Sequence, residues 1–300
     1  MSQPDVPDYL VRATAHGGRV RAMAIRATAV VADLASRHGT EPAVTAGLGR
    51  LATGALLFGA QLKAADQLVT LRVKGNGPAG QLLASANGRG EVRALVSNPR
   101  PGVEQVRNGK LNVSGAVGSQ GMLTVTRDLG MREPYAGTVE LVSGEIGEDL
   151  AHYLLRSEQI PSAVGIGVFV RPDATVEAAG GYMVQVLPEL TEGAAAALEE
   201  TIAALPHPTA MLRAGDSPED ILARIFPDGY EALGTTPVRF HCPCTRERAE
   251  RALVLLGQDA IREIIQEEGP AGAELTCEFC TARYALTLEE LRELAARAAA

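Results

Sequence analysis

The chain has 300 residues and a formal net charge of −8, with 46% hydrophobic residues, 4% aromatic residues and no tryptophan. Its length favours at least two folding units, and its apolar content is sufficient for a core built mainly from aliphatic side chains. The acidic balance argues against nucleic acid and against an anionic membrane as partners, because both require a positive field on the protein.

The N-terminal segment gives no sign of export. The first residues, MSQPDVPDYLVRATAHGG, lack the basic segment and the following apolar stretch of a secretory leader. The longest apolar run, Leu51 to Leu62, is too short to cross a bilayer. We therefore expect a cytoplasmic protein with no membrane partner, in a compartment that keeps thiols reduced.

The first part of the chain alternates strand and helix signals. DYLVRATA and RVRAMAIRA predict two strands, and AVVADLASRHG predicts a helix that ends before Gly39. Residues 43–62 are apolar nearly all round, which predicts a helix buried on several sides. Asn87-Gly88 and Pro172-Asp173 then mark β-hairpins. Runs of strands with few helices between them predict an α+β core domain over residues 1–187, with a mixed but mainly antiparallel sheet.

A different composition begins at Pro188. The first predicted helix of this part has an apolar stripe at i, i+4 and i+7, formed by Leu198, Ile202 and Leu205. In the second, Ser217 is the expected N-cap and Asp220 its capping-box partner. Two short amphipathic helices between proline breaks predict a helical linker, residues 188–236, that docks on another part of the protein.

All four cysteines lie in the last part, residues 237–300, which we expect to be a small zinc-binding domain. Cys242 and Cys244 are separated by one residue, and after 32 further residues Cys277 and Cys280 are separated by two. Zinc takes four ligands tetrahedrally, and each short pair can supply two thiolates. The spacing predicts one zinc ion per chain, held by these four cysteines.

The last part has few apolar residues for its size, so the metal is expected to contribute to its folding. A structural zinc supplies about 10 kcal/mol or more of folding free energy. Thiolates are also what oxidants attack, and a disulfide within each pair could not hold zinc, so the motif can act as a switch. His241 is an alternative ligand, although we interpret it as a neighbouring side chain because four cysteines already complete a tetrahedron.

Two other classes of function use similar cysteine patterns. A zinc ribbon that binds nucleic acid needs positive charge, whereas residues 237–300 contain 8 arginines, no lysine and 11 acidic residues. A zinc-dependent thiol-disulfide oxidoreductase would use CxxC catalytically, normally at the start of a helix that follows a strand, and this setting is missing here. We keep the oxidoreductase as the alternative interpretation.

The cysteine spacing and several longer segments resemble one known family. CxC followed by CxxC matches its zinc signature, and further resemblance lies in KGNGPAGQLLASANGRGEVRALVSNP, LTVTRDLGMREPYAGTVEL, GEIGEDLAHYLLRSEQIPSAVGIGV and AAGGYMVQVLP. Together these segments extend over nearly the whole chain. They are similar to the redox-regulated holdase chaperones of the 33 kDa heat-shock protein (33 kDa chaperonin) family.

The resemblance implies a complete functional cycle. The reduced form would bind zinc through Cys242, Cys244, Cys277 and Cys280 and would be inactive. Oxidation with unfolding stress would join Cys242 to Cys244 and Cys277 to Cys280, release zinc, and unfold the C-terminal domain and the linker. The activated protein, typically a homodimer, would bind unfolding client proteins without ATP and prevent their aggregation. No enzymatic activity is implied.

Overall fold

The computed structural model describes residues 6–107 and 109–298. The chain divides into two compact units, Met1–His241 and Cys242–Ala300. Antiparallel sheets combine with helices in this chain, which confirms the α+β class. Among the described strands, β13 and β5 pair in parallel while the other pairs are antiparallel, as the prediction of a mainly antiparallel core requires.

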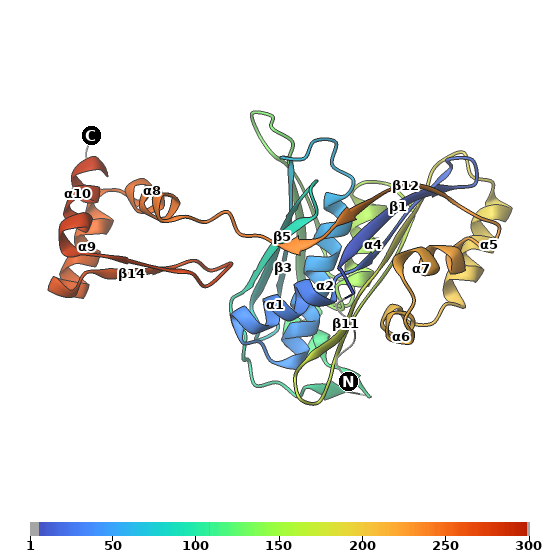
Figure 1. The fold of residues 1–300 in the computed structure, drawn as a ribbon, viewed down its shortest axis with the longest axis horizontal. Helices are drawn as coiled ribbons and strands as arrows, with labels where there is room; N and C mark the ends of the chain where they lie inside the picture. Colours follow the sequence, from blue (N-terminus) through green and yellow to red (C-terminus); the bar gives the residue numbers. More distant parts are fainter. Residues whose placement is uncertain (1–5, 108, 299–300) are drawn as a thin grey trace. The chain divides into compact units, whose positions relative to one another are not determined.

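Two sheets form the frame of the first unit (Figure 1). The first sheet has the spatial order β10 (Ser162–Val170), β11 (Val176–Val186), β2 (Val20–Arg26), β1 (Tyr9–Ala15), β12 (Glu231–Pro237). The second has the order β13 (Arg239–Phe240), β5 (Glu91–Val96), β4 (Gln81–Asn87), β3 (Leu68–Gly75), β8 (Gly121–Asp128), β9 (Tyr135–Glu140). A short ladder of β6 (Val106–Arg107) with β7 (Lys110–Leu111) lies outside both sheets. The hairpins predicted at Asn87-Gly88 and Pro172-Asp173 are confirmed as the β4–β5 and β10–β11 connections.

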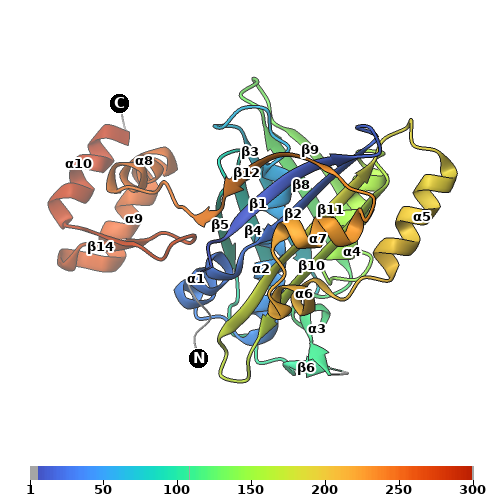
Figure 2. The ribbon, with the colours of Figure 1, turned by 45° about the vertical axis from the view of Figure 1, so that its right-hand side comes forward.

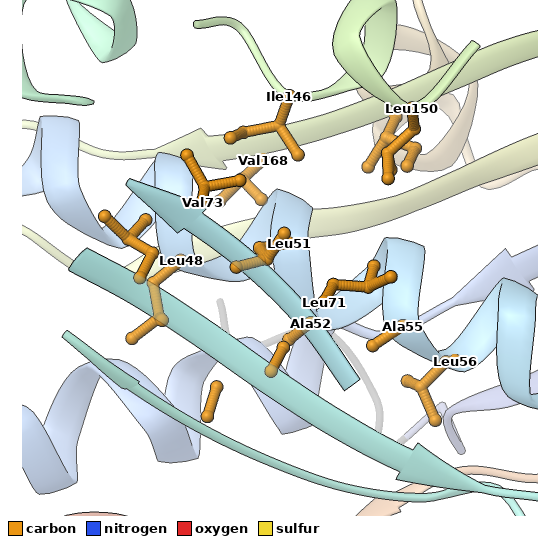
Figure 3. Close-up of a cluster of buried hydrophobic side chains, with 14 of the residues drawn as sticks. Leu48, Leu51, Ala52, Ala55, Leu56, Leu71, Val73, Ile146, Leu150 and Val168 are labelled. Carbon is orange, nitrogen blue, oxygen red and sulfur yellow. The ribbon is translucent and has the colours of Figure 1, made fainter. Parts of the chain in front are cut away.

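Helix α2 (Pro42–Gly59) occupies the centre of the core and contacts strands of both sheets. Every residue from Ala43 to Gly59 is buried except Arg50. Figure 3 shows side chains of α2 close to Leu71 of β3 and Leu150 of α4. A helix buried on several sides, as predicted for residues 43–62, is thus confirmed. The remaining helices of the core are α1 (Thr28–His38), α3 (Val113–Val117) and α4 (Gly147–Arg156).

The segment after the core contributes three helices where two were predicted: α5 (Glu192–Ala203), α6 (Pro208–Ala214) and α7 (Pro218–Ile225). Helix α6 was missed because it begins at Pro208, and proline is tolerated at the first position of a helix. Helices α6 and α7 pack on strands of the first sheet, on the face that α2 does not cover (Figure 2). As predicted, the Ser217 hydroxyl accepts from the Asp220 backbone N–H at 3.1 Å, and the Asp220 carboxylate accepts from the Ser217 N–H at 2.9 Å. The segment then ends in strand β12, which the sequence pattern does not predict.

The second unit is built from helices α8 (Arg246–Leu256), α9 (Gln258–Glu268) and α10 (Leu288–Ala298), a 3-10 turn η1 (Gly269–Ala271), and the hairpin of β14 (Ala273–Thr276) with β15 (Arg283–Leu286). Its buried apolar cluster is small and consists of Leu253, Ile261, Leu286, Leu291, Leu294 and Ala295. No helix among the described residues of the chain is long and apolar enough to span a bilayer.

Candidate metal centre

The CxC motif lies in the extended segment that leads into α8. Thr245, directly after Cys244, caps this helix, since its hydroxyl accepts from the Arg248 backbone N–H at 3.3 Å. The Arg248 guanidinium donates back to the carbonyl of Pro243, the residue between the two cysteines, at 2.8 Å. The first turn of α8 therefore holds the backbone on either side of Cys244, at Pro243 and at Thr245.

The CxxC motif forms the tight turn between β14 and β15. The Cys277 backbone N–H donates to the Ala282 carbonyl at 2.9 Å, and the Thr281 N–H donates to the Cys277 carbonyl at 2.8 Å. Thr281 adopts a left-handed conformation with φ of 59°, which is uncommon for a β-branched residue. The hairpin thus turns both thiols of the CxxC motif toward one point.

The four sulfur atoms gather in one cluster in which all lie within 4.8 Å of one another. The Sγ atoms of Cys242 and Cys277 are 3.8 Å apart, and those of Cys244 and Cys280 are 3.0 Å apart. Zinc–sulfur bonds of roughly 2.3 Å give a tetrahedron with edges of about 3.8 Å, so the cluster has the dimensions of a four-thiolate site. These cysteines are able to hold a metal ion.

The cluster stabilises a negative charge on one of its members. Burial by itself raises the pKa of the Cys244 thiol, but hydrogen bonds from the Tyr284 hydroxyl and from the other cysteines lower it to about 7. Burial, followed by the hydrogen bond to Cys244, raises the pKa of Cys280. The Tyr284 hydroxyl lies 3.2 Å from Cys244 Sγ, and this contact raises the pKa of the phenol to about 12. Tyr284 is therefore neutral at neutral pH, and its hydrogen bond to Cys244 favours the thiolate form of that cysteine.

Arg246 braces the two cysteine-bearing segments against each other. From the start of α8 its guanidinium donates to the Ala285 carbonyl of β15 at 2.9 Å and to the Glu250 carboxylate at 2.9 Å. It also pairs with Glu290 of α10. Arg246 thus connects α8, β15 and α10 through contacts that do not involve the thiols.

The sequence identified the four cysteines that come together, and it missed the residues that support them. In the described part of the chain, the group that could hold a metal comprises these cysteines and does not include His241, whose backbone N–H donates to Val92 at 2.9 Å. Tyr284 and Arg246 were not predicted. The available signal was their position, since each lies within a few residues of a cysteine motif and carries donors suited to a thiolate or a carbonyl.

Comparison with known proteins gives one consistent result. Residues 8–287 match the family model described as Hsp33 protein. The 33 kDa chaperonin of Bacillus subtilis (strain 168) is 46% identical over 287 residues, which are 96% of this chain and 98% of that protein. That of Geobacter sulfurreducens is 47% identical over 292 residues, 96% of this chain and 95% of that protein. The crystal structure of the 33 kDa chaperonin from Thermotoga maritima superimposes with a TM-score of 0.88 at 36% identity, covering 97% of this chain and 98% of that chain.

Proposed function

Because this chain belongs to the Hsp33 family, whose curated relatives are 33 kDa chaperonins, we propose that it is a redox-regulated holdase that works without ATP. In the reduced state its cysteines hold one zinc ion and the protein is inactive. In the oxidised state the zinc is released, and the protein binds unfolding polypeptides and prevents their aggregation. It acts in the cytoplasm, as a homodimer when active, and by binding rather than by catalysis.

The observation that carries this proposal is the gathering of four thiols in a unit with only a small apolar cluster. When bound, zinc would join the CxC segment to the CxxC hairpin and keep the four sulfurs as thiolates. A unit of this size depends on such a cross-link, because its buried apolar surface is too limited to offset the entropy of ordering the chain. If the thiolates are oxidised, the zinc can no longer be held, and the second unit should unfold.

The switch itself is the formation of two disulfides. Since both sulfurs are thiolates in the zinc-bound form, Cys242 and Cys244 would give two electrons to one hydrogen peroxide. The peroxide takes up two protons from solvent and becomes two waters as the Sγ–Sγ bond forms. Cys277 and Cys280 react with a second peroxide in the same way. In the folded cluster short Sγ distances also occur across the motifs. Once the tail unfolds, however, cysteines 35 or 36 positions apart meet rarely, whereas the members of each motif stay close.

The proposed client-binding surface comes from the linker. We assign residues 1–187 to the core domain, 188–236 to the linker and 237–300 to the redox switch. Helices α6 and α7 bury Met211, Leu212, Ile221 and Leu222 against the first sheet. Undocking these helices would expose apolar side chains on both partners, and such a surface binds the apolar segments of unfolding proteins.

The experiment follows zinc, thiols and activity together. Reduced protein is treated with peroxide at mildly elevated temperature, and zinc content, free thiols, helix content and suppression of light scattering from a heat-unfolded client enzyme are measured at each time. We expect one zinc per chain to leave as four thiols disappear, with client protection rising in step. Mapping of the disulfides should find Cys242–Cys244 and Cys277–Cys280.

Two outcomes would contradict the proposal. If oxidised protein retained its zinc and a protease-resistant tail, the switch would be absent, and equal client protection by the reduced form would indicate a constitutive chaperone. A variant with Cys242→Ser and Cys244→Ser loses both the zinc site and the first disulfide, so its tail should already be unfolded before peroxide is added. Turnover in an insulin-reduction assay would instead support the thiol-disulfide oxidoreductase, although CxxC lies in a β-hairpin turn here and not at the start of a helix.

A further inference from the structure

A pocket of about 820 Å³ opens where the linker meets the core, and the cysteine switch does not use it. Its core wall includes Arg50 of α2, the β6–β7 ladder and Tyr182 of β11. Its linker wall is the turn between α5 and α6, residues 205–208. The volume lies within the range of sites that bind small molecules.

Two cations of the core wall, Arg107 and Lys110, have no acidic partner among the described residues. Arg107 and Lys110 stand directly opposite each other in the β6–β7 ladder. Like charges in this position repel, and neither forms an ion pair with an acidic side chain among residues 6–107 and 109–298. Of the two acids in the lining, Glu145 is engaged by Arg50 at 2.6 Å and by the Ser114 N–H at 3.2 Å. Glu148 is the other and is exposed.

The positive charges of the core wall also act on His207 of the linker. Burial, followed by the charges of Arg50 and Lys110, lowers the pKa of His207, so its imidazole is neutral at neutral pH. Its Nδ1 lies 2.8 Å from the Thr209 hydroxyl. The ring rests on bare backbone of β10, since a Cβ at Gly167 would lie 2.5 Å from His207 Cε1. Residues 205–208 line the pocket, so a ligand bound there would contact them and favour their docked position on β10.

Part of the lining is apolar. It is formed by Leu111, Val164, Ile166, Leu205, Pro206 and the ring of Tyr182. A ligand that fits must combine an anionic head for Arg107 and Lys110 with an apolar or ring-shaped body for this wall. Arginine and lysine together are suited to a phosphate group, and an inorganic ion would leave the apolar wall without a contact.

We propose that this pocket binds an organic phosphomonoester, and that the bound molecule holds the linker docked on the core. The regulatory part rests on the proposed function, because it assumes that undocking activates the protein. A ligand that contacts both walls binds the docked state only. At ten times its Kd it would lower the undocked population about 11-fold.

The test uses full-length reduced protein and three probes: AMP, which carries both parts, adenosine, which lacks the phosphate, and inorganic phosphate. Hydrogen exchange of the amides of residues 205, 210 and 211 reports docking without any chaperone assay. We expect AMP to slow their exchange about 11-fold at ten times its Kd, and adenosine and phosphate to have much smaller effects. During peroxide treatment AMP should also lengthen the lag before client protection appears.

A double variant, Arg107→Gln with Lys110→Gln, should weaken AMP binding by roughly tenfold or more, since it removes two charge-assisted contacts. Arg72→Gln with Lys74→Gln is the matched control, because it removes the same charges from exposed positions of β3 outside the pocket. No protection by AMP at 10 mM, or equal protection in both double variants, would overturn the site. Phosphate or adenosine as effective as AMP would overturn the proposed ligand. If AMP slowed hydrogen exchange but the oxidised protein bound no client, the ligand site would be supported and the proposed holdase function would be rejected.

Discussion

The two units of this protein are stabilised in opposite ways. In the first, α2 is buried along nearly its whole length between two sheets, and Leu51, Ala52 and Leu57 are completely inaccessible. In the second, three helices and a hairpin share a cluster of six buried residues, while Leu255 of α8 remains 87% exposed. The difference teaches that the first unit can be stable through apolar burial alone, whereas a unit with as little apolar burial as the second needs a further source of stability, which in the proposed function is the metal cross-link.

The largest expected effect is the loss of the tail on metal removal. With thiols kept reduced, a chelator should abolish hydrogen-exchange protection throughout residues 242–298, because the metal contributes about 10 kcal/mol or more to the folding of a small unit. Amides of α2 should keep their protection. The same chelator saturated with zinc is the control. If residues 242–298 kept their hydrogen-exchange protection without metal, the claim that the second unit depends on a metal for its stability would be wrong.

A cavity in the core should destabilise the first unit and leave the second unit unchanged. Phe58 of α2 is fully buried, with its ring 6.1 Å from that of Tyr153. Phe58→Ala should lower the unfolding free energy of the first unit by about 3–5 kcal/mol. Urea unfolding would measure this, and zinc content and tail protection should be unchanged. Leu255→Ala, at an exposed position, should alter stability by less than about 0.5 kcal/mol.

The docking of the linker can be tested by a substitution that lies outside the apolar core and outside the cysteine cluster. In Gly167→Ala the new methyl group would lie 2.5 Å from His207 Cε1 and 2.6 Å from Thr209 Cγ2. We expect the docking of α6 to weaken by about 1–3 kcal/mol, as for other overpacked sites. Faster exchange over residues 208–214 and some client protection by the reduced protein would follow. Gly193→Ala in α5 is the control, since nothing lies within 4 Å of its Cβ position.

The smallest effect is expected at Tyr9, whose hydroxyl donates to the Glu219 carboxylate of α7 at 2.7 Å. Tyr9→Phe should weaken the docking of α7 by about 1 kcal/mol. Burial and this hydrogen bond raise the pKa of Tyr9 to about 12, so the contribution is complete below pH 10 and lost as the pH rises through 12. The stability difference between wild type and variant should shrink over that interval, and a constant difference would contradict the assignment.

Local patterns predicted much of this structure because their causes are local. Gly39 has a left-handed conformation after α1, Ser217 caps the helix that it was expected to cap, and Asn87-Gly88 connects two strands. Each feature depends on residues within a few positions of one another, so the sequence pattern contains the whole interaction.

The features that were missed depend on distant residues. Strand β12 pairs with β1, more than two hundred positions earlier, and its sequence EALGTTP has no strong alternation to announce it. At the candidate metal centre the cysteine spacing predicted that the four cysteines would come together, whereas the contact from Tyr284 to Cys244 depends on how the hairpin folds against the CxC segment. Geometry of this kind is set by tertiary packing and not by the motif.

The pairing of β1 with β12 also orders events during synthesis. A ribosome releases the chain from its N-terminus, so β1 and β2 emerge early, while one edge of β1 remains open until residues 231–237 have been made. The linker helices emerge before that strand, and Cys242 follows soon after it. A newly made chain therefore passes through a stage in which one edge of β1 is open before Cys242, the first cysteine of the sequence, has left the ribosome.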